Sequence, residues 1–295
     1  MLPKFVKNVG DLQTKHRAIC EGFLAQALQK SKKAEPFVEE AIVFYKALKK
    51  VKSVEELLSS PKYRDDIASA CGFSDKAQSQ LTEAELNGAI KKILARIYKE
   101  AGLEFRENIL YRYLLTKGDA LGGSMRNLTG ASANIKLTEK IIERLSGNEK
   151  KIQVLKSKAG KVQRVIWNGR TLLFDTKPRL VGKNIDVILI NRMDVNTPEK
   201  ELLADKSKYL ACGELKGGID PAGADEHWKT ANSALGRIRT AFRRNAPALF
   251  FVAAAIETSM AKEIFRQLEN GKLSHAANLN DEDQVNDLVD WLLSL

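Results

Sequence analysis

The sequence predicts an α/β fold in which a mixed sheet flanked by helices follows a helical N-terminal region. Two observations support this prediction: apolar residues recur at helical spacing up to about residue 146, and short apolar runs typical of strands replace that spacing after residue 150. The composition is that of a globular chain, because 44% of the 295 residues are hydrophobic and 29% are charged. A chain of this length forms one large domain or two smaller ones.

The N-terminal part is predicted to be a succession of helices. Apolar residues recur at helical spacing in 23–28 and in 37–48, another helix opens at Leu86, and 137–145 closes the set. The glycine-rich stretch 118–127 is predicted to be a loop that interrupts these helices. Its glycines allow the backbone to approach another group closely, most simply at the entry of a helix.

The C-terminal part is predicted to contain a hairpin, further strands and three helices. Asn168-Gly169 lies between two apolar runs and is typical of a type I′ turn, which predicts the hairpin. Strands are predicted at 184–190, 209–216 and 248–256, and helices at about 225–243, 260–270 and 281–293.

Positive charge is in excess and is concentrated in one segment. The formal net charge is +11, which indicates an anionic partner without naming it. The densest run, from Lys150 to Lys183, has ten basic residues and one acid, Asp175. Such a run is either a solvated surface or a surface that contacts the phosphate backbone of a nucleic acid.

The sequence also excludes several classes of protein. No segment approaches the ~20 apolar residues of a membrane span, and the start lacks the apolar core of a secretory signal. The three cysteines, Cys20, Cys71 and Cys212, have no metal-ligand spacing and leave one unpaired. We therefore expect a protein of the reduced cytoplasm.

Two acids and a lysine have the spacing of a catalytic centre. Asp186 interrupts an apolar strand, and Glu214 and Lys216 share one face of a later strand. If the two strands are neighbours, the three side chains can form a Mg²⁺ site for phosphodiester hydrolysis, in which the carboxylates hold the ion and the lysine orients or helps to deprotonate water. A solvent-facing Glu-x-Lys pattern and a structural Asp186–Lys216 ion pair are the alternatives.

Two further residues follow this pattern closely in the sequence. His227 lies near the start of a predicted helix, where it is either a general base that activates water or a structural histidine. Asp220 lies on a loop bounded by glycine and proline. It can accept a hydrogen bond from cytosine N4 in the major groove, or it can cap the following helix.

At these residues the sequence resembles the AvaI/BsoBI family of type II restriction endonucleases, which belongs to the PD-(D/E)xK nuclease superfamily. Nearly the whole chain shares the resemblance, from about residue 10 onward. The segments that carry it are 213–232, 183–186, 113–127, 74–83 and 253–261.

The resemblance implies a bacterial enzyme with a restriction-endonuclease-like sheet. A helical subdomain at 1–100 would help to enclose DNA, and a nuclease catalytic domain would occupy 101–295, with helices at 101–146 and the sheet and its helices at 160–295. The implied activity is Mg²⁺-dependent hydrolysis of both strands of double-stranded DNA at C-Y-C-G-R-G, leaving 5′ overhangs. The implied partners are a second copy, in a homodimer that encircles DNA, and a functionally paired DNA methyltransferase.

The resemblance also implies residue roles at matching positions. Asp186 and Glu214 would bind the metal and act with Lys216 in catalysis, and His227 would help to activate water. Lys183 and Asp220 would reach bases in the major groove, and Lys76 the minor groove. The segment 145–162 is shorter than in the family and rich in lysine. This difference in length can change the local DNA contacts or the geometry of the dimer.

Two other functions fit the same residues. A repair or recombination nuclease of the same superfamily would prefer branched or damaged DNA to a particular sequence. A non-catalytic DNA-binding protein would use the Asp186–Lys216 contact only to stabilise its fold.

Overall fold

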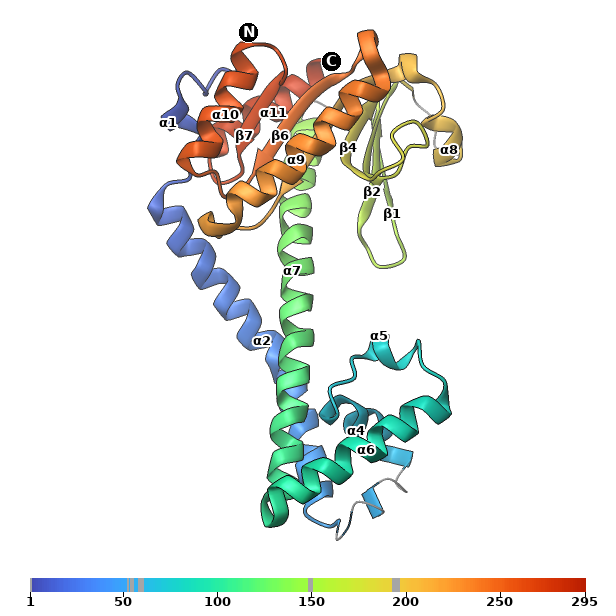
Figure 1. The fold of residues 1–295 in the computed structure, drawn as a ribbon. Coiled ribbons are helices and arrows are strands. Elements are labelled where there is room, and N and C mark those ends of the chain that lie inside the picture. Colours follow the sequence, from blue (N-terminus) through green and yellow to red (C-terminus); the bar gives the residue numbers. More distant parts are fainter. Residues whose placement is uncertain (1, 52, 54–55, 58–60, 148–150, 193–196) are drawn as a thin grey trace. The chain divides into compact units, whose positions relative to one another are not determined.

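The structure is a computed structural model that describes residues 2–51, 53, 56–57, 61–147, 151–192 and 197–295. The chain forms two compact units (Figure 1). The larger unit comprises Met1–Leu24 and Leu128–Leu295, and the smaller comprises Ala25–Asn127. Among the described helices, none combines the length and the apolar character needed to cross a membrane. The predicted division at residue 100, with one part enclosing DNA and the other cutting it, stays a prediction.

A seven-stranded mixed sheet forms the centre of the larger unit, which confirms the predicted α/β fold. The strands lie side by side in sequence order, antiparallel from β1 to β5 and parallel from β5 to β7. Their bounds are β1 Ile152–Lys156, β2 Val162–Trp167, β3 Arg170–Thr176, β4 Ile185–Ile190, β5 Tyr209–Lys216, β6 Ala248–Ala253 and β7 His275–Asn278.

The predicted hairpin joins β2 to β3. Asn168 and Gly169 have φ values of 35° and 75°, and two consecutive positive values are what a type I′ turn requires. Trp167 pairs with Arg170 directly across that turn. The turn therefore sets the register of the hairpin, as the sequence predicted.

Helices cover both faces of the sheet. One face packs against α9 (Pro221–Phe242) and α10 (Thr258–Glu269), and Figure 1 shows α9 crossing in front of the strands. The other face packs against the C-terminal part of α7 (Phe105–Gly147) and α11 (Glu282–Ser294). The larger unit is thus a three-layer sandwich with an apolar core on each side of the sheet. Short helices α1 (Val9–Leu12) and α8 (Glu199–Leu202) complete it.

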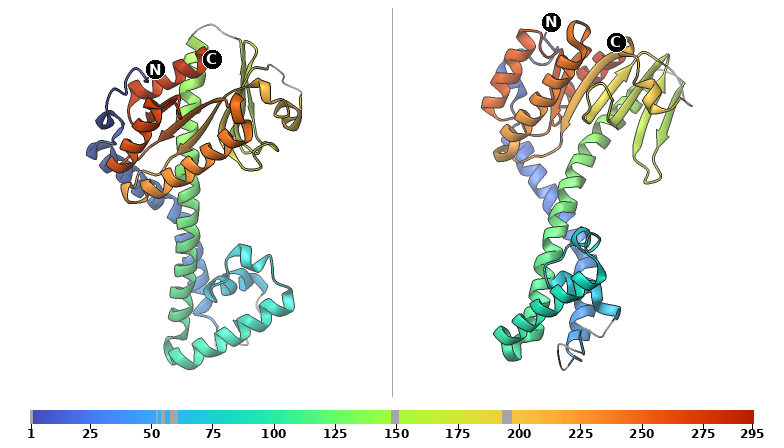
Figure 2. Two further views of the ribbon diagram at one scale, coloured as in Figure 1. Left: turned by 45° about the horizontal axis from the view of Figure 1, so that its top comes forward. Right: turned by 45° about the vertical axis from the view of Figure 1, so that its right-hand side comes forward.

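The smaller unit contains helices and, among its described residues, no strand. It contains most of α2 (His16–Leu48), α4 (Arg64–Ala70), α5 (Asp75–Gln78), α6 (Glu83–Ala101) and the N-terminal part of α7. Figure 2 shows α4 against α6 in both of its views. Buried side chains from α2, α6 and α7 share one core, in which the rings of Phe44 and Tyr113 lie 5.0 Å apart. The apolar spacing seen in 37–48 reflects this core, because Ala41, Phe44 and Leu48 are buried in it. The apolar residues of 23–28 do not contribute to it, since Phe23, Leu24 and Leu28 are exposed.

The loop predicted at 118–127 is wrong. These residues lie inside α7, which is continuous from Phe105 to Gly147. A glycine inside a helix costs only about 1 kcal/mol relative to alanine. Apolar residues on either side of the glycines, such as Tyr113 and Leu137, are fully buried, and their packing outweighs the local preference of the glycines for a turn.

His275 is a buried histidine that makes folding sensitive to pH. Its side chain is 2% exposed, its Nε2 lies 3.2 Å from Asp287 Oδ2, and its Nδ1 has no hydrogen-bond partner among the described residues. Burial lowers the pKa of His275, and the Asp287 carboxylate opposes this only in part. The folded state therefore keeps the ring neutral at pH values where the unfolded chain, with a pKa near 6.5, already binds a proton.

We expect the free energy of unfolding to fall as the pH drops below about 6.5, by up to about 1.4 kcal/mol per pH unit from this group. Urea unfolding on both sides of that pH measures the effect. His275→Gln is expected to lose this part of the pH dependence, whereas His16→Gln, at an exposed histidine, is expected to keep it. Equal slopes for wild type and His275→Gln would contradict this assignment.

Candidate active site

Asp186, Glu214 and Lys216 lie on neighbouring strands, as the sequence prediction required. Val187 of β4 pairs with Gly213 of β5, so Asp186 lies opposite Glu214. Strand alternation places all three side chains on the face that packs against α9 and α10. A strongly apolar pair of strands thus positions two carboxylates and one ammonium group together at the end of the core.

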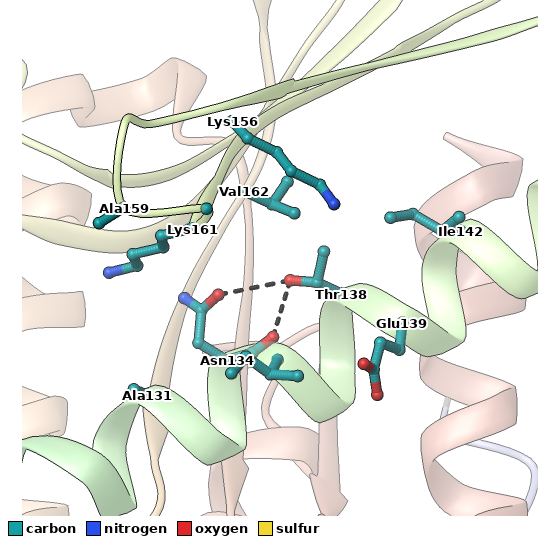
Figure 3. Close-up of a pocket in the computed structure, with 11 residues that line it drawn as sticks. Ala131, Asn134, Thr138, Glu139, Ile142, Lys156, Ala159, Lys161 and Val162 are labelled. Atoms are coloured by element: carbon teal, nitrogen blue, oxygen red, sulfur yellow. Dashed lines mark hydrogen bonds between the residues drawn. The ribbon is translucent and has the colours of Figure 1, made fainter.

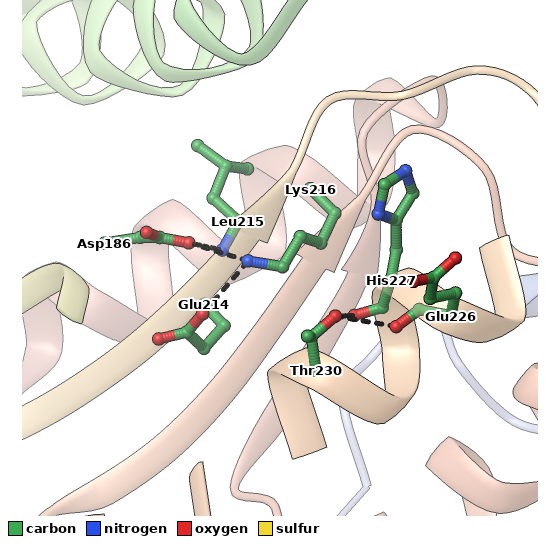
Figure 4. A network of polar contacts seen from close by, with 7 residues as sticks. All are labelled: Asp186, Glu214, Leu215, Lys216, Glu226, His227 and Thr230. Carbon is green, nitrogen blue, oxygen red and sulfur yellow. Dashed lines mark hydrogen bonds and ion pairs between the residues drawn. The ribbon is translucent and has the colours of Figure 1, made fainter. Parts of the chain in front are cut away.

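The three side chains contact one another directly (Figure 4). Lys216 Nζ lies 3.1 Å from Glu214 Oε2 and 3.3 Å from Asp186 Oδ2. Asp186 Oδ2 also accepts a hydrogen bond of 2.8 Å from the backbone N–H of Leu215. We call Asp186, Glu214 and Lys216 the trio. The backbone contact holds the Asp186 side chain against the strand that bears the other two members.

Burial and charge act together on the trio. Glu214 is only 4% exposed. Burial, together with the nearby Asp186 carboxylate, raises the pKa of Glu214 to about 7, although Lys216 opposes both effects. Burial disfavours the Lys216 ammonium group, but Asp186 and Glu214 outweigh this effect and raise the pKa of Lys216. Lys216 is therefore a cation that offsets two crowded carboxylates.

The trio fits a hard divalent cation. Glu214 Oε1 is buried and has no hydrogen-bond partner within the described residues, so this acceptor is available to a ligand. The part of the chain that the structure describes contains no cluster of three or more His, Cys, Asp or Glu side chains suited to a metal. Mg²⁺ commonly uses one or two carboxylates together with water and phosphate oxygens. Structural zinc needs four ligands and catalytic zinc three, which disfavours zinc here.

Glycines around β5 allow close packing next to the trio. A Cβ on Gly213 would overlap the Phe250 ring. A Cβ on Gly217, which follows Lys216, would lie 2.8 Å from the Ala133 Cβ of α7 and closer still to the Thr129 carbonyl oxygen. In the sequence, Gly217 directly follows the predicted strand 209–216. Its contact with α7 could not be found from the sequence, because the two segments are distant in the chain.

His227 and Asp220 lie just beyond the trio. His227 is exposed on α9, and its Nε2 lies next to the backbone of Gly218. Its ring makes no hydrogen bond within the described ranges, and Lys216 lies between it and Asp186 in the view of Figure 4. Asp220 is the N-cap of α9, where Oδ1 accepts a hydrogen bond of 3.0 Å from the Ala222 N–H. The capping role proposed for Asp220 is therefore present in the structure.

The two remaining predicted residues are lysines on the surface. Lys183 is exposed and precedes β4, three residues before Asp186. Lys76 is exposed in α5 of the smaller unit. Both ammonium groups are thus accessible to an anionic ligand.

Comparison with known proteins decides the family. The profile described as Restriction endonuclease BsobI matches residues 3–295. Type II restriction enzymes named AvaI, from Nostoc sp. and Anabaena variabilis, are each 40% identical over 310 residues, covering 98% of both chains. The type II restriction enzyme BsoBI from Geobacillus stearothermophilus is 40% identical over 314 residues, covering 98% of this chain and 97% of its own.

The chain belongs to the BsoBI restriction endonuclease family. The resemblance inferred from the sequence is thereby confirmed, and the enzyme class is that of a type II restriction enzyme, a nuclease and hydrolase. The trio lies within the matched region of this BsoBI-family chain.

The basic run of this BsoBI-family chain leaves most of its charges exposed. Arg164 and Arg170 bond to backbone or amide oxygens, and Lys161 pairs with Asp175. Six other basic residues are exposed and have no ion pair within the described ranges: Lys151, Lys156, Lys158, Lys177, Arg179 and Lys183. These free charges are available to a polyanion.

A groove of about 440 Å³ lies between α7 and the β1–β2 hairpin (Figure 3). Apolar side chains such as Ile135, Ile142 and Val162 line it, and Lys156 projects over it. Asn134 and Thr138 are buried and hydrogen-bonded to each other: Thr138 Oγ1 donates to the Asn134 carbonyl oxygen at 2.7 Å. The groove contains no member of the trio, so it is separate from the candidate active site of this family member.

Proposed function

We propose that this enzyme hydrolyses both strands of double-stranded DNA in a Mg²⁺-dependent reaction at C-Y-C-G-R-G, cutting after the first cytosine to leave 5′ overhangs. The observation that carries the proposal is the contact of Asp186, Glu214 and Lys216 on adjacent strands. It occurs in a chain whose relatives over almost its full length are named type II restriction enzymes.

The chain's own groups would supply binding and orientation. Asp186 and Glu214 would hold the metal ion, with the free oxygen Glu214 Oε1 pointing to an additional ligand. When bound, Mg²⁺ stabilises charge on the scissile phosphate and lowers the pKa of a coordinated water. Lys216, kept cationic by its two neighbours, would orient the attacking water and offset charge on the phosphate.

The proposal is tested by digesting plasmid DNA with Mg²⁺ and sequencing the ends. Discrete fragments with one end sequence report activity, recognition site and stagger together. A repair or recombination nuclease of the same superfamily would instead leave undamaged plasmid intact or cut it at scattered positions. A folded preparation that never cuts DNA would support the non-catalytic alternative.

His227 is proposed to help activate the attacking water. Its ring is exposed beside Gly218 and has no hydrogen-bond partner among the described residues, so it is free to contact substrate or water. We expect His227→Ala to slow cleavage by about 10²–10⁴-fold, the usual contribution of general acid–base catalysis. DNA binding measured without metal is expected to be unchanged. Equal cleavage rates for the variant and the wild type across the pH range would remove His227 from the mechanism.

Asp220 is proposed to contact a cytosine N4 in the major groove, with Lys183 reaching bases nearby and Lys76 reaching the minor groove. Asp220→Ser keeps an N-cap hydroxyl for α9 but is too short to reach a base. We expect it to lose about 1–3 kcal/mol of discrimination at one C·G pair with little change in stability. Competition binding against substituted sites measures this; unchanged relative affinities would refute the base contact.

The remaining proposals concern how the enzyme works in the cell. The helical part would help to enclose the DNA, the sheet-containing part would cut it, and a homodimer would encircle the duplex. A bacterial cytoplasmic enzyme that cuts both strands also needs a paired DNA methyltransferase to protect the host. Expression without such a methyltransferase is expected to damage host DNA, and harmless expression of the active enzyme would argue against the pairing.

A further inference from the structure

The first turns of α9, which carry His227, bury little that can fix the rotation of the helix. Residues 217–220 connect the end of β5 to Pro221, the first residue of α9. Among residues 221–231, the buried side chains are Ala224, Trp228 and Ala231. Burial of small apolar groups is not directional. Trp228 is therefore the side chain of this part of α9 that can set its rotation.

Trp228 is held from two sides. Its ring is fully buried and lies 5.0 Å from the ring of Phe251, edge to face. Phe251 is the partner of Glu214 in the pairing of β5 with β6. On the other side, Trp228 Nε1 donates a hydrogen bond of 2.6 Å to Oε2 of Glu263, an exposed residue of α10. Hydrogen bonds to ionised acceptors are short and strong, so Glu263 fixes the orientation of the indole.

A second set of contacts joins the same two helices one turn further along. Asn232 Nδ2 donates to Glu263 Oε1 at 3.3 Å. Gln267 Nε2 donates to Asn232 Oδ1 at 3.0 Å. Asn232 follows Trp228 by four residues, and Gln267 follows Glu263 by four, which is about one helical turn in each case. Contacts at two levels resist rotation of α9 against α10.

The position of the His227 ring depends on this rotation. A Cβ on Gly218 would lie 3.1 Å from His227 Nε2, and a Cβ on Gly223 would lie 3.7 Å from it. His227 and Trp228 are consecutive, so they turn together. A rotation of about 10° moves a group at the helix surface, roughly 5–6 Å from the axis, by about 1 Å. A misplacement of that size can cost about 10²-fold in rate.

We propose that Glu263 is a positioning residue of this enzyme. By holding the Trp228 indole it fixes the rotation of α9 and keeps the His227 ring beside Gly218, next to the end of β5. The inference rests on the proposed role of His227 in activating water. Glu263 makes no hydrogen bond or ion pair with the trio in the part of the chain that the structure describes, so its effect passes through α9.

The first test measures single-turnover cleavage at saturating DNA and Mg²⁺. Glu263→Leu removes both acceptors and is expected to slow cleavage by about 10–100-fold, with unchanged DNA affinity without metal. Trp228→Phe removes the donor but keeps an aromatic ring, and we expect a similar loss. Glu263→Gln keeps one acceptor oxygen for the indole N–H and is expected to restore nearly the wild-type rate. Glu269→Leu, at an exposed residue of the same helix, is the matched control.

The second test asks whether the effect passes through His227. In a His227→Ala background, Glu263→Leu is expected to cause no further loss of rate, because the group that it positions is absent. A role in stability alone would lower the folded fraction equally in both backgrounds, and circular dichroism measures that fraction. Equal losses of rate in the two backgrounds, or a wild-type rate for Glu263→Leu, overturn the proposal.

The third test needs no cleavage. The chain has three histidines, so NMR of histidine-labelled protein gives few ring signals, and His227→Ala identifies that of His227. We expect Glu263→Leu to shift this signal and Glu263→Gln to restore it, with the signal of the exposed His16 unchanged. An unmoved His227 signal in Glu263→Leu overturns the inference. A shifted signal in an enzyme whose His227→Ala variant cleaves normally would leave the positioning standing and reject the proposed role of His227.

Discussion

Replacing Lys216 with alanine is expected to abolish detectable DNA cleavage while leaving the protein folded and able to bind DNA. Lys216 Nζ is the only cation within contact of the two trio carboxylates among the described residues. Removal of one preorganised charge that stabilises a transition state costs about 10²–10³-fold in rate. Loss of the group that also orients the attacking water is expected to place the variant at or beyond the upper end of that range.

Stability measurements separate this catalytic role from a structural ion pair. If the contact served only the fold, removing Lys216 would leave buried charges uncompensated and cost about 3–5 kcal/mol. Lys216 and Asp186 retain 23% and 21% side-chain exposure, and Glu214 can take up a proton, so we expect a loss of about 1–2 kcal/mol. Urea unfolding, single-turnover cleavage and metal-free DNA binding are the measurements. Lys229→Ala removes an exposed lysine of α9 and controls for lost charge.

A Lys216→Ala protein that cuts DNA at the wild-type rate would show that the lysine is dispensable. A variant that fails to fold would support the structural alternative instead. Lys216→Met then provides a second measurement, because methionine keeps most of the apolar stem of the lysine without its charge. Folded but inactive Lys216→Met protein would restore the catalytic assignment.

Local patterns in the sequence predicted most of the larger unit. The hairpin follows from Asn168-Gly169, and β4, β5 and β6 follow from apolar runs that stay buried in the sheet. Strand β7 was missed, because His275–Asn278 contains no β-branched or large aromatic residue. Its conformation comes from parallel pairing with β6, which is a contact between distant segments. Strand β1 was also missed, because its extended conformation depends on pairing with β2.

The trio could be predicted because strand alternation fixes which side chains share a face. The prediction needed one assumption, that β4 and β5 are neighbours, and the pairing of Val187 with Gly213 meets it. Other features of the site depend on atoms that no residue pattern specifies. The Leu215 N–H bond to Asp186 and the unpartnered Glu214 Oε1 are set by backbone placement and burial. For Asp220 the sequence allowed either a base contact or a helix cap, and the structure contains the capping hydrogen bond.

Replacing Glu214 with glutamine is expected to abolish both cleavage and stabilisation by Mg²⁺. The substitution keeps the size of the side chain but exchanges an anionic oxygen ligand for a neutral amide. A ligand present at about 100 times its Kd stabilises the state that it binds by about 2.7 kcal/mol. For a protein of this size we expect that gain to appear as a rise of about 4 °C in Tm for the wild type. Glu214→Gln is expected to show almost none of it.

The metal-free stability of Glu214→Gln makes this result interpretable. Glutamine relieves the repulsion with Asp186 and the cost of burying a carboxylate, but it loses the ion pair with Lys216. These effects oppose each other, so we expect the free energy of unfolding without metal to change by no more than about 1 kcal/mol. Glu269→Gln, at an exposed glutamate of α10, controls for lost charge and is expected to keep the Mg²⁺ response. A full Mg²⁺-induced rise in Tm for Glu214→Gln would contradict the role of Glu214 as a metal ligand and would mean that the ion binds without it.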